Sequence, residues 1–293
     1  MKRMAITCVG SLLFLQSFAL CRLGDAQSVT VLVTDPRPIA DAAIRLEQVY
    51  GVPINYEDPI TVNESRMENR SDHVQGTSVS PRQTMVHKTE SLSFTYRVPK
   101  SLPSWGGDPQ QFKAESIRAV ADALTSVLAG YAASGAPENF SIREEDEMLF
   151  IVPKDFLNKE GKLAVTSPIM DTKLTISPRS RTRGDFLEEF CKSLSDAANA
   201  RVTCMFQLDP RILQKQTTAS GSGVTAHSLL DQLLVELNAP KTKGIAYIFG
   251  PNGERVPKEA VFNRSLGAFS WQLRFVIGGG YVLSGGYTSV AND

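Results

Sequence analysis

The side chains that could carry acid–base or metal chemistry are few, and they do not gather in the sequence. The only histidines are His73, His87 and His227. His73 and His87 lie in a polar segment without the short, regular spacing of metal ligands. His227 falls in the first turn of an expected helix, where an exposed imidazole is ordinary. We therefore predict surface positions for the histidines and no metal site.

Two groups of acidic residues are candidate sites. Glu57 and Asp58 could act as an acid–base pair, but adjacent strand residues point to opposite faces, and Pro59 indicates a turn. The acidic residues between positions 64 and 72 are typical of a cation-binding loop, yet the glycine that such a loop needs at its bend is missing. We interpret the pair as turn residues and the others as solvated acids.

The glycine-rich segments do not form a phosphate-binding loop. Gly221-Ser-Gly223 and Gly278-Gly-Gly280 lack the lysine and the strand–loop–helix context of such a loop. They are interpreted as a loop and as the turn of a hairpin. The sequence therefore predicts no catalytic residue and no cofactor.

The two tryptophans have different expected positions. Trp271 lies in an alternating strand, which indicates a core position. Trp105 lies among prolines and glycines, in a loop, and aromatic side chains dominate contact energies where proteins meet. Trp105 is therefore the candidate surface contact.

The cysteine pattern depends on how the chain begins. Cys8 and Cys21 fall in the leader described below, which leaves Cys191 and Cys204. An even pair in an exported protein favours a disulfide, and a helix followed by a strand that packs against it can place the two sulfurs together. Two buried thiols that act as small hydrophobic side chains are the alternative.

Residues 1–26 have the pattern of a secretory signal peptide. Lys2 and Arg3 precede an apolar run to Leu20, and Gly24-Asp25-Ala26 places small residues at the cleavage site. An uncleaved anchor helix and a lipoprotein modified at Cys21 are the less favoured alternatives, because the run is marginally short and Leu20 precedes that cysteine. We predict a periplasmic or secreted protein without a membrane span after cleavage.

Charge limits the classes of partner. The 293 residues include 31 basic and 31 acidic ones, so the formal net charge is zero and nucleic-acid binding is disfavoured. The one local basic cluster contains Arg179, Arg181 and Arg183, and a short charged loop is usually solvated. With 42% hydrophobic residues, the chain has enough apolar material for a core.

Hydrophobic periodicity predicts an α+β fold in two similar halves. A polar loop over residues 60–90 interrupts the first half, and an insertion over residues 240–268 interrupts the second. The regular elements expected in the first half are a strand (29–33), a helix carrying Ile39 to Tyr50, strands at 52–56 and 91–96, a helix (116–132) and a hairpin (140–143 and 148–152). Those expected in the second half are a strand (173–177), a helix (184–200), strands at 201–206 and 216–221, a helix carrying Leu229 to Leu237, and a hairpin (270–277 and 281–284).

The second half also resembles a known family in three places. These are Leu174-Thr-Ile176 with Phe186-Leu-Glu-Glu-Phe190, then Val224-Thr-Ala-His-Ser-Leu-Leu-Asp-Gln-Leu-Leu234, and Ser270-Trp-Gln-Leu-Arg274 with Gly280-Tyr-Val-Leu283. Over residues 172–284 the chain resembles the short N-terminal (STN) domain of secretins and TonB-dependent signalling receptors. That domain is a small periplasmic module with helices packed on small sheets. The resemblance implies a protein-interaction role in the cell envelope.

These observations lead to one prediction of organisation and two hypotheses of function. We expect a signal peptide (1–26), an α+β module (27–157), a linker (158–170), a second, STN-like module (171–285) and a loose tail (286–293). The leading hypothesis is an exported, non-enzymatic interaction protein whose partner is another cell-envelope protein bound at a sheet edge. The alternative is an exported hydrolase or small-ligand-binding protein with a site between the modules.

Overall fold

The structure is a computed structural model of the 293-residue chain. It describes residues 28–59, 67–69, 85–97, 109–136, 138–158, 160, 162–238, 243–249, 255–261, 268–276 and 280–288. The expected signal peptide, His73 and Trp105 lie outside these residues. None of the described helices has the length and apolarity needed to cross a bilayer.

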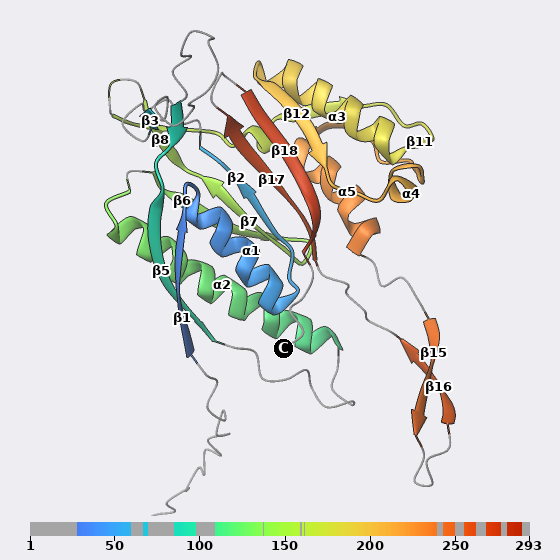
Figure 1. The fold of residues 1–293 in the computed structure, drawn as a ribbon. Coiled ribbons are helices and arrows are strands. Elements are labelled where there is room, and N and C mark those ends of the chain that lie inside the picture. Colours follow the sequence, from blue (N-terminus) through green and yellow to red (C-terminus); the bar gives the residue numbers. More distant parts are fainter. Residues whose placement is uncertain are drawn as a thin grey trace, which may run out of the picture.

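A six-stranded mixed sheet forms the centre of the molecule (Figure 1). Its strands, in spatial order, are β12 (Arg201–Phe206), β18 (Gly280–Thr288), β17 (Ala268–Val276), β2 (Ile54–Glu57), β7 (Met148–Pro153) and β6 (Phe140–Glu145). Helices pack on this sheet and smaller sheets lie outside them, so the predicted α+β class is confirmed.

The first half packs two helices between two sheets. The helices are α1 (Pro38–Tyr50) and α2 (Pro109–Ala133), and the outer sheet pairs β1 (Ser28–Asp35) with β5 (Glu90–Arg97) antiparallel. One buried cluster joins Leu92 of the outer sheet, Leu46 of α1 and Ile54 of the central sheet. Gly130 allows α2 to lie close to β5, because a Cβ atom there would be 2.7 Å from the Ser93 carbonyl oxygen.

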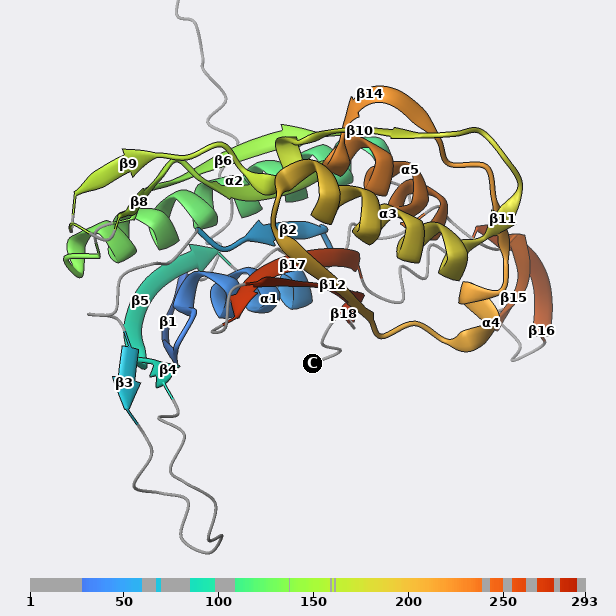
Figure 2. The same cartoon turned by 90° about the horizontal axis from the view of Figure 1, so that it is seen from above.

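The second half repeats this layering on the opposite face of the central sheet (Figure 2). Its helices are α3 (Arg183–Ala198) and α5 (Ala226–Asn238), and its outer sheet pairs β10 (Lys173–Ile176) with β14 (Gly221–Thr225) antiparallel. Three short elements complete this half: β11 (Arg181–Thr182), which pairs with β13 (Gln216–Thr217), and α4 (Pro210–Leu213).

Local sequence explains where the first helix of each half begins and ends. Pro38 stands in the first turn of α1, where its missing N–H costs nothing. The Thr182 side chain accepts a hydrogen bond from the Asp185 N–H and caps α3. Gly51 and Asn199 follow the two helices with φ of 66° and 48°, the left-handed conformation that these residue types tolerate.

The two expected modules share one sheet. β17 of the second half pairs in parallel with β2 of the first, with Gln272 beside Tyr56 and Leu273 beside Glu57. The hydrophobic cluster of the second half also includes Phe150 of β7. The predicted boundary therefore does not separate two independent cores.

Several predicted boundaries differ from the structure. The segment 60–90 holds a short hairpin of β3 (Met67–Asn69) and β4 (Met85–His87) in place of a plain loop, and the insertion 240–268 holds a hairpin of β15 (Lys243–Phe249) and β16 (Arg255–Val261). The linker begins inside a hairpin of β8 (Asp155–Leu157) and β9 (Leu163–Val165), and it leads to a 3₁₀ turn, η3 (Ile169–Asp171). β18 continues to Thr288, into the expected tail, because β17 begins early enough to pair with it.

A disulfide joins α3 to the edge strand β12. The sulfurs of Cys191 and Cys204 are bonded, with their Cα atoms 6.1 Å apart and a sequence separation of 13. The bond fixes β12 to the helix that packs on it.

Removing this cross-link is expected to destabilise the protein. A disulfide that closes a loop of about 15 residues stabilises by ~3 kcal/mol, mainly by restricting the unfolded chain. The double variant Cys191→Ala, Cys204→Ala should lose about 2–4 kcal/mol of unfolding free energy in urea titrations. Wild-type protein held in reductant is the control and should lose a similar amount, whereas an unchanged midpoint in both would contradict the prediction.

Candidate functional site

Asp58 connects the two halves where β2 meets β17. Its Oδ2 accepts from the Phe275 N–H at 2.8 Å and from Arg37 Nε at 2.6 Å. Its own N–H donates to the Leu273 carbonyl at 2.8 Å, and Arg37 Nη2 donates to the Phe275 carbonyl at 2.6 Å. These contacts cross-link three segments that are distant in sequence.

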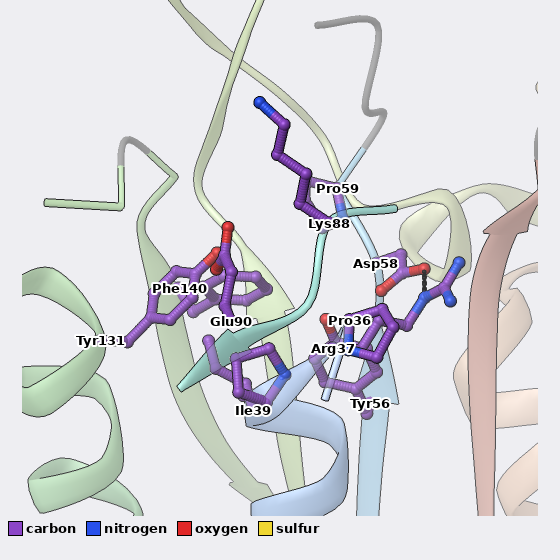
Figure 3. A pocket seen from close by; sticks show the side chains of 11 residues that line it. Pro36, Arg37, Ile39, Tyr56, Asp58, Pro59, Lys88, Glu90, Tyr131 and Phe140 are labelled. Atoms are coloured by element: carbon purple, nitrogen blue, oxygen red, sulfur yellow. Dashed lines mark hydrogen bonds and ion pairs between the residues drawn. The ribbon is translucent and has the colours of Figure 1, made fainter. Parts of the chain in front are cut away.

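A small hollow lies beside the Arg37–Asp58 ion pair (Figure 3). Its lining includes Ile39, Tyr56 and Phe140, and its volume is about 30 Å³. That volume suits one water molecule and is far below the several hundred Å³ of a ligand pocket. The ion pair is therefore part of the junction, and the described residues leave room beside it for one water molecule.

Glu57 is buried on the other side of the same strand. The oxygens of its carboxyl group accept hydrogen bonds from the backbone N–H groups of Ile169 and Met170, the latter at 3.2 Å, and the residue is 1% exposed. Burial raises the pKa of Glu57 to about 8, against the opposing effect of these two N–H donors. Glu57 thereby holds the linker turn η3 against the sheet.

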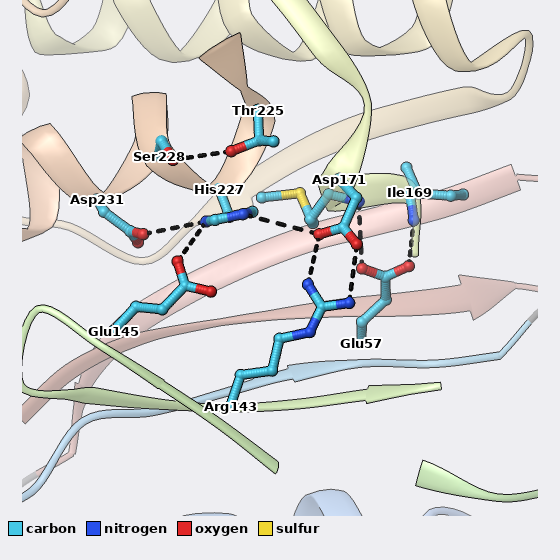
Figure 4. A network of polar contacts seen from close by, with 10 residues as sticks. Glu57, Arg143, Glu145, Ile169, Asp171, Thr225, His227, Ser228 and Asp231 are labelled. Atoms are coloured by element: carbon cyan, nitrogen blue, oxygen red, sulfur yellow. Dashed lines mark hydrogen bonds and ion pairs between the residues drawn. The ribbon is translucent and has the colours of Figure 1, made fainter. Parts of the chain in front are cut away.

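A network of charged side chains continues from this turn to helix α5 (Figure 4). Arg143 of β6 makes two hydrogen bonds to Asp171, at 2.8 and 2.9 Å. His227 lies among three carboxylates, with N···O distances of 3.7 Å to Asp171, 3.5 Å to Glu145 and 3.6 Å to Asp231. The network connects the first-half hairpin, the linker turn and α5.

The carboxylates determine the charge of His227. Burial by itself lowers the pKa of His227, but Asp231, Glu145 and Asp171 more than offset this and raise it. Burial raises the pKa of Asp231 in turn, against the opposing effect of His227. The side chain of His227 is 13% exposed, so the predicted surface position was wrong, because α5 packs against the hairpin and the linker turn.

The chemistry open to this network is limited. Its charged groups contact one another, and among the described residues no set of His, Cys, Asp and Glu side chains could hold a metal ion. Glu57 and Asp58 are buried and bind different partners, so the interpretation of both as turn residues was wrong. The arrangement supports the joint between the halves.

The basic cluster is also structural. Arg181 is 6% exposed, and it donates to Glu189, to the Ser177 carbonyl and to the Ala219 carbonyl at 2.9 Å. Arg183 is buried as well, whereas Arg179 is exposed. The prediction of a solvated loop holds only for Arg179, because local spacing does not show that helix α3 folds back on this segment.

The remaining candidates are placed as follows. Trp271 is 1% exposed, which confirms the core prediction. Gly221-Ser-Gly223 begins β14, and His87 ends β4. Trp105 and His73 lie outside the described residues, so nothing tests the surface contact.

A wider hollow of about 580 Å³ lies between the linker and the second half. Its lining includes Pro168, Asp171, Asn199, Phe275 and Tyr281. The Tyr281 hydroxyl is buried, and no described residue makes a hydrogen bond to it. The volume is in the range of small-molecule sites. Sequence analysis missed this hollow, because its walls come from four separate segments.

The outer edge of β12 is an open, partly apolar surface. Gln207 donates its N–H to Gly285 of β18, at 3.0 Å. Since successive strand residues turn their main-chain groups to opposite edges, Cys204 and Phe206 present theirs away from β18. No other described strand pairs with β12 there, and the neighbouring Met205 is 59% exposed.

The fold and these sites define an α+β protein, and among the described strands β12 and β6 are the edge strands of its central sheet. No protein family, curated protein sequence or solved structure matches the chain.

The buried carboxyl of Glu57 predicts a pH-dependent stability. An acid whose pKa rises from 4.5 to about 8 on folding takes up a proton as the chain folds between these pH values. The stability that Glu57 adds through this proton uptake is complete below pH 4.5 and is lost as the pH rises through 8. The steepest possible dependence is ~1.4 kcal/mol per pH unit.

Urea titrations between pH 5 and pH 8.5 should show wild-type stability falling as the pH rises. Glu57→Gln should flatten this fall, and the part that remains would come from His227 and Asp231, whose raised pKa values have the same sign. Glu160→Gln, at a 71% exposed side chain, is the matched control and should follow wild type. An undiminished fall in Glu57→Gln would show that this carboxyl is ionised in the folded protein.

Proposed function

We propose that the mature chain is an exported, non-enzymatic interaction protein that binds an extended segment of another cell-envelope protein along β12. The open edge of β12 is the observation that carries this proposal. A strand presents a row of main-chain donors and acceptors to an added strand, and side chains beside the edge supply specificity. Here the main-chain groups belong to Cys204 and Phe206, and the exposed side chain is Met205.

The surroundings of the edge favour binding. The disulfide at Cys204 fixes β12 to α3, so an added strand meets a pre-ordered template. Ser195 occupies the outward N–H of Val202, which donates to its Oγ at 2.9 Å. The single hydroxyl proton of Ser195 is shared between the Cys191 carbonyl at 2.7 Å and the Val202 carbonyl at 3.1 Å. This limits the available edge to the segment around Met205.

Export rests on two features. Residues 1–26 have the charge and apolar pattern of a signal peptide. Disulfides persist in oxidising compartments outside the cytoplasm, and the Cys191–Cys204 bond agrees with that location. The resemblance to periplasmic STN domains supports a protein-interaction role in the cell envelope.

A displayed-peptide selection tests binding at the edge. Random extended peptides should be enriched on immobilised residues 27–293, and Met205→Lys should bind the enriched clones at least ~10-fold more weakly, since a charge would be buried under the added strand. Val235→Lys, at an exposed valine of α5, is the matched control and should bind as wild type does. Equal enrichment on Met205→Lys would exclude this edge as the site.

The wide hollow beside Tyr281 supports a second candidate, a small-ligand-binding protein. A buried hydroxyl without a partner among the described residues is available to a ligand with a hydrogen-bonding group. The hydrolase form of this alternative is tested directly with generic ester and peptide substrates.

A thermal-shift screen of small polar metabolites measures ligand binding at the hollow. A true ligand should raise the melting temperature of wild type and have a smaller effect on Tyr281→Phe, which removes only the hydroxyl. Tyr50→Phe, in the first half, is the control variant. If every stabilising compound acts equally on all three proteins, the hollow is not their site.

A further inference from the structure

The two halves of the central sheet have the same strand connectivity. In the first half β2 lies parallel to β7, which is the second strand of the β6–β7 hairpin. In the second half β12 lies parallel to β18, which is the second strand of the β17–β18 hairpin. Each half therefore contributes three strands in one order: β2-β7-β6 and β12-β18-β17.

The helix ends define which residues correspond. Gly51 and Asn199 each follow a helix in the left-handed conformation, and each donates its N–H to the carbonyl four residues earlier. Aligning these two residues makes Ile54 equivalent to Val202, and the strand registers then make Leu149 equivalent to Tyr281. Through the two hairpins, β6 corresponds to β17, with Ile142 equivalent to Leu273 and Glu144 equivalent to Phe275.

The two halves are related by a rotation combined with a translation. Repeating this operation therefore produces a further unit and does not return to the first one. Their strand order along the sheet is the same, but β2 runs opposite to β12, and their helices cover opposite faces. This corresponds to a half-turn about an axis along the sheet combined with a shift of three strands. In a head-to-tail relation of this kind, the first and the last unit each keep one strand edge that has no partner within the repeat.

The unused surfaces lie at the two ends of the sheet. The internal junction pairs β17 with β2. The equivalent of β17 is β6 and the equivalent of β2 is β12, and both are edge strands of the six-stranded sheet. One end of the molecule therefore presents the type of strand that the other end accepts.

We propose that a second copy of this chain is the partner at β12, bound through its β6 strand in a parallel head-to-tail junction. This inference rests on the proposed function, since it names the strand that occupies the β12 edge. The register of the internal junction places Ile142 of one copy beside Met205 of the next. The apolar Met205, 59% exposed in a single copy, is covered in the assembly.

The β17–β2 junction within one chain (the internal junction) also indicates the strength of the β6–β12 junction between two copies (the external junction). The Leu273 carbonyl accepts from the Asp58 N–H, and the equivalent bond runs from the Phe206 N–H to the Ile142 carbonyl of the second copy. The charged contacts do not recur, since Phe206 replaces Asp58 and offers no carboxylate to a neighbouring cation or N–H group. The external junction therefore relies on main-chain bonds and the Ile142–Met205 contact, and it is weaker and reversible.

Light scattering of purified residues 27–293 tests the assembly. The mean mass should rise beyond two copies as the concentration is raised about a hundredfold, because a head-to-tail junction can be repeated. A mass that stays at one copy, or a rise that stops at two copies, would overturn the proposal. A stop at two copies would instead indicate a symmetric dimer.

Two edge variants give a sharper test. Met205→Lys blocks β12. Glu144→Pro blocks β6 by removing the N–H that, at the equivalent Phe275, points to the neighbouring strand. Each variant alone should stay a monomer, and an equimolar mixture should form a heterodimer, because one intact β12 meets one intact β6. Val235→Lys is the control and should assemble as wild type does.

Folding of each variant is checked by its urea unfolding curve, and Ile142→Lys serves as the second β6 block if Glu144→Pro is destabilised. A mixture that remains monomeric would refute the β6–β12 pairing. Failure of this inference remains distinct from failure of the proposed function: a monomeric chain whose peptide binding depends on Met205 would retain the edge site and lose only its partner.

Discussion

The parallel pairing of β17 with β2 is the interaction on which the rest of the structure depends. It converts two three-stranded sheets into one six-stranded sheet, although only Tyr56 and Glu57 of the first half are paired directly with β17. Such short pairing is weak by itself. Side-chain contacts reinforce it on both faces, through Asp58 with Arg37 and through Glu57 with the linker turn.

Glu57 and the charged network beside it lie where the two halves meet. Glu57 is buried, and burial raises its pKa to about 8. Two backbone N–H groups bind its carboxyl group and offset part of the cost of burying it. Arg143, Asp171 and His227 continue the network to α5 at the edge of the buried region. Arg143, Asp171 and His227 have partners on other segments, and a displacement of one half would leave these groups without partners at a cost in free energy.

The outer edges differ from the joint in the residues that would stabilise an added strand. β2 is followed by Asp58, whose carboxylate accepts hydrogen bonds from Arg37 and from the Phe275 N–H. The equivalent residue of β12 is Phe206, which follows the exposed Met205. The proposed junction between two copies therefore lacks the charged contacts that reinforce the internal one. Main-chain pairing with a small apolar contact makes that junction reversible, since the free edge stays compatible with water.

By itself, the amino-acid sequence determined the type and order of the regular elements. Apolar spacing in α2, the first-turn proline of α1 and the strand alternation around Trp271 are local properties, and they predicted the α+β class and two similar halves. The disulfide between Cys191 and Cys204 was one of two open alternatives, because sequence spacing does not supply the 6.1 Å between their Cα atoms.

Only the tertiary structure decided that the halves share a sheet and that β12 and β6 are its edges. Pairing between β17 and β2 joins residues more than 200 positions apart, and no local pattern encodes a partner at that distance. The same reason explains why the contacts of Glu57 and His227 were not predicted, since Glu57 binds the linker turn and His227 lies beside Glu145 of the first half. Arg181 differs, because the helix that it contacts, α3, follows directly in the sequence. The sequence specifies which strands form, and long-range packing specifies which of them lie at the edges of the sheet.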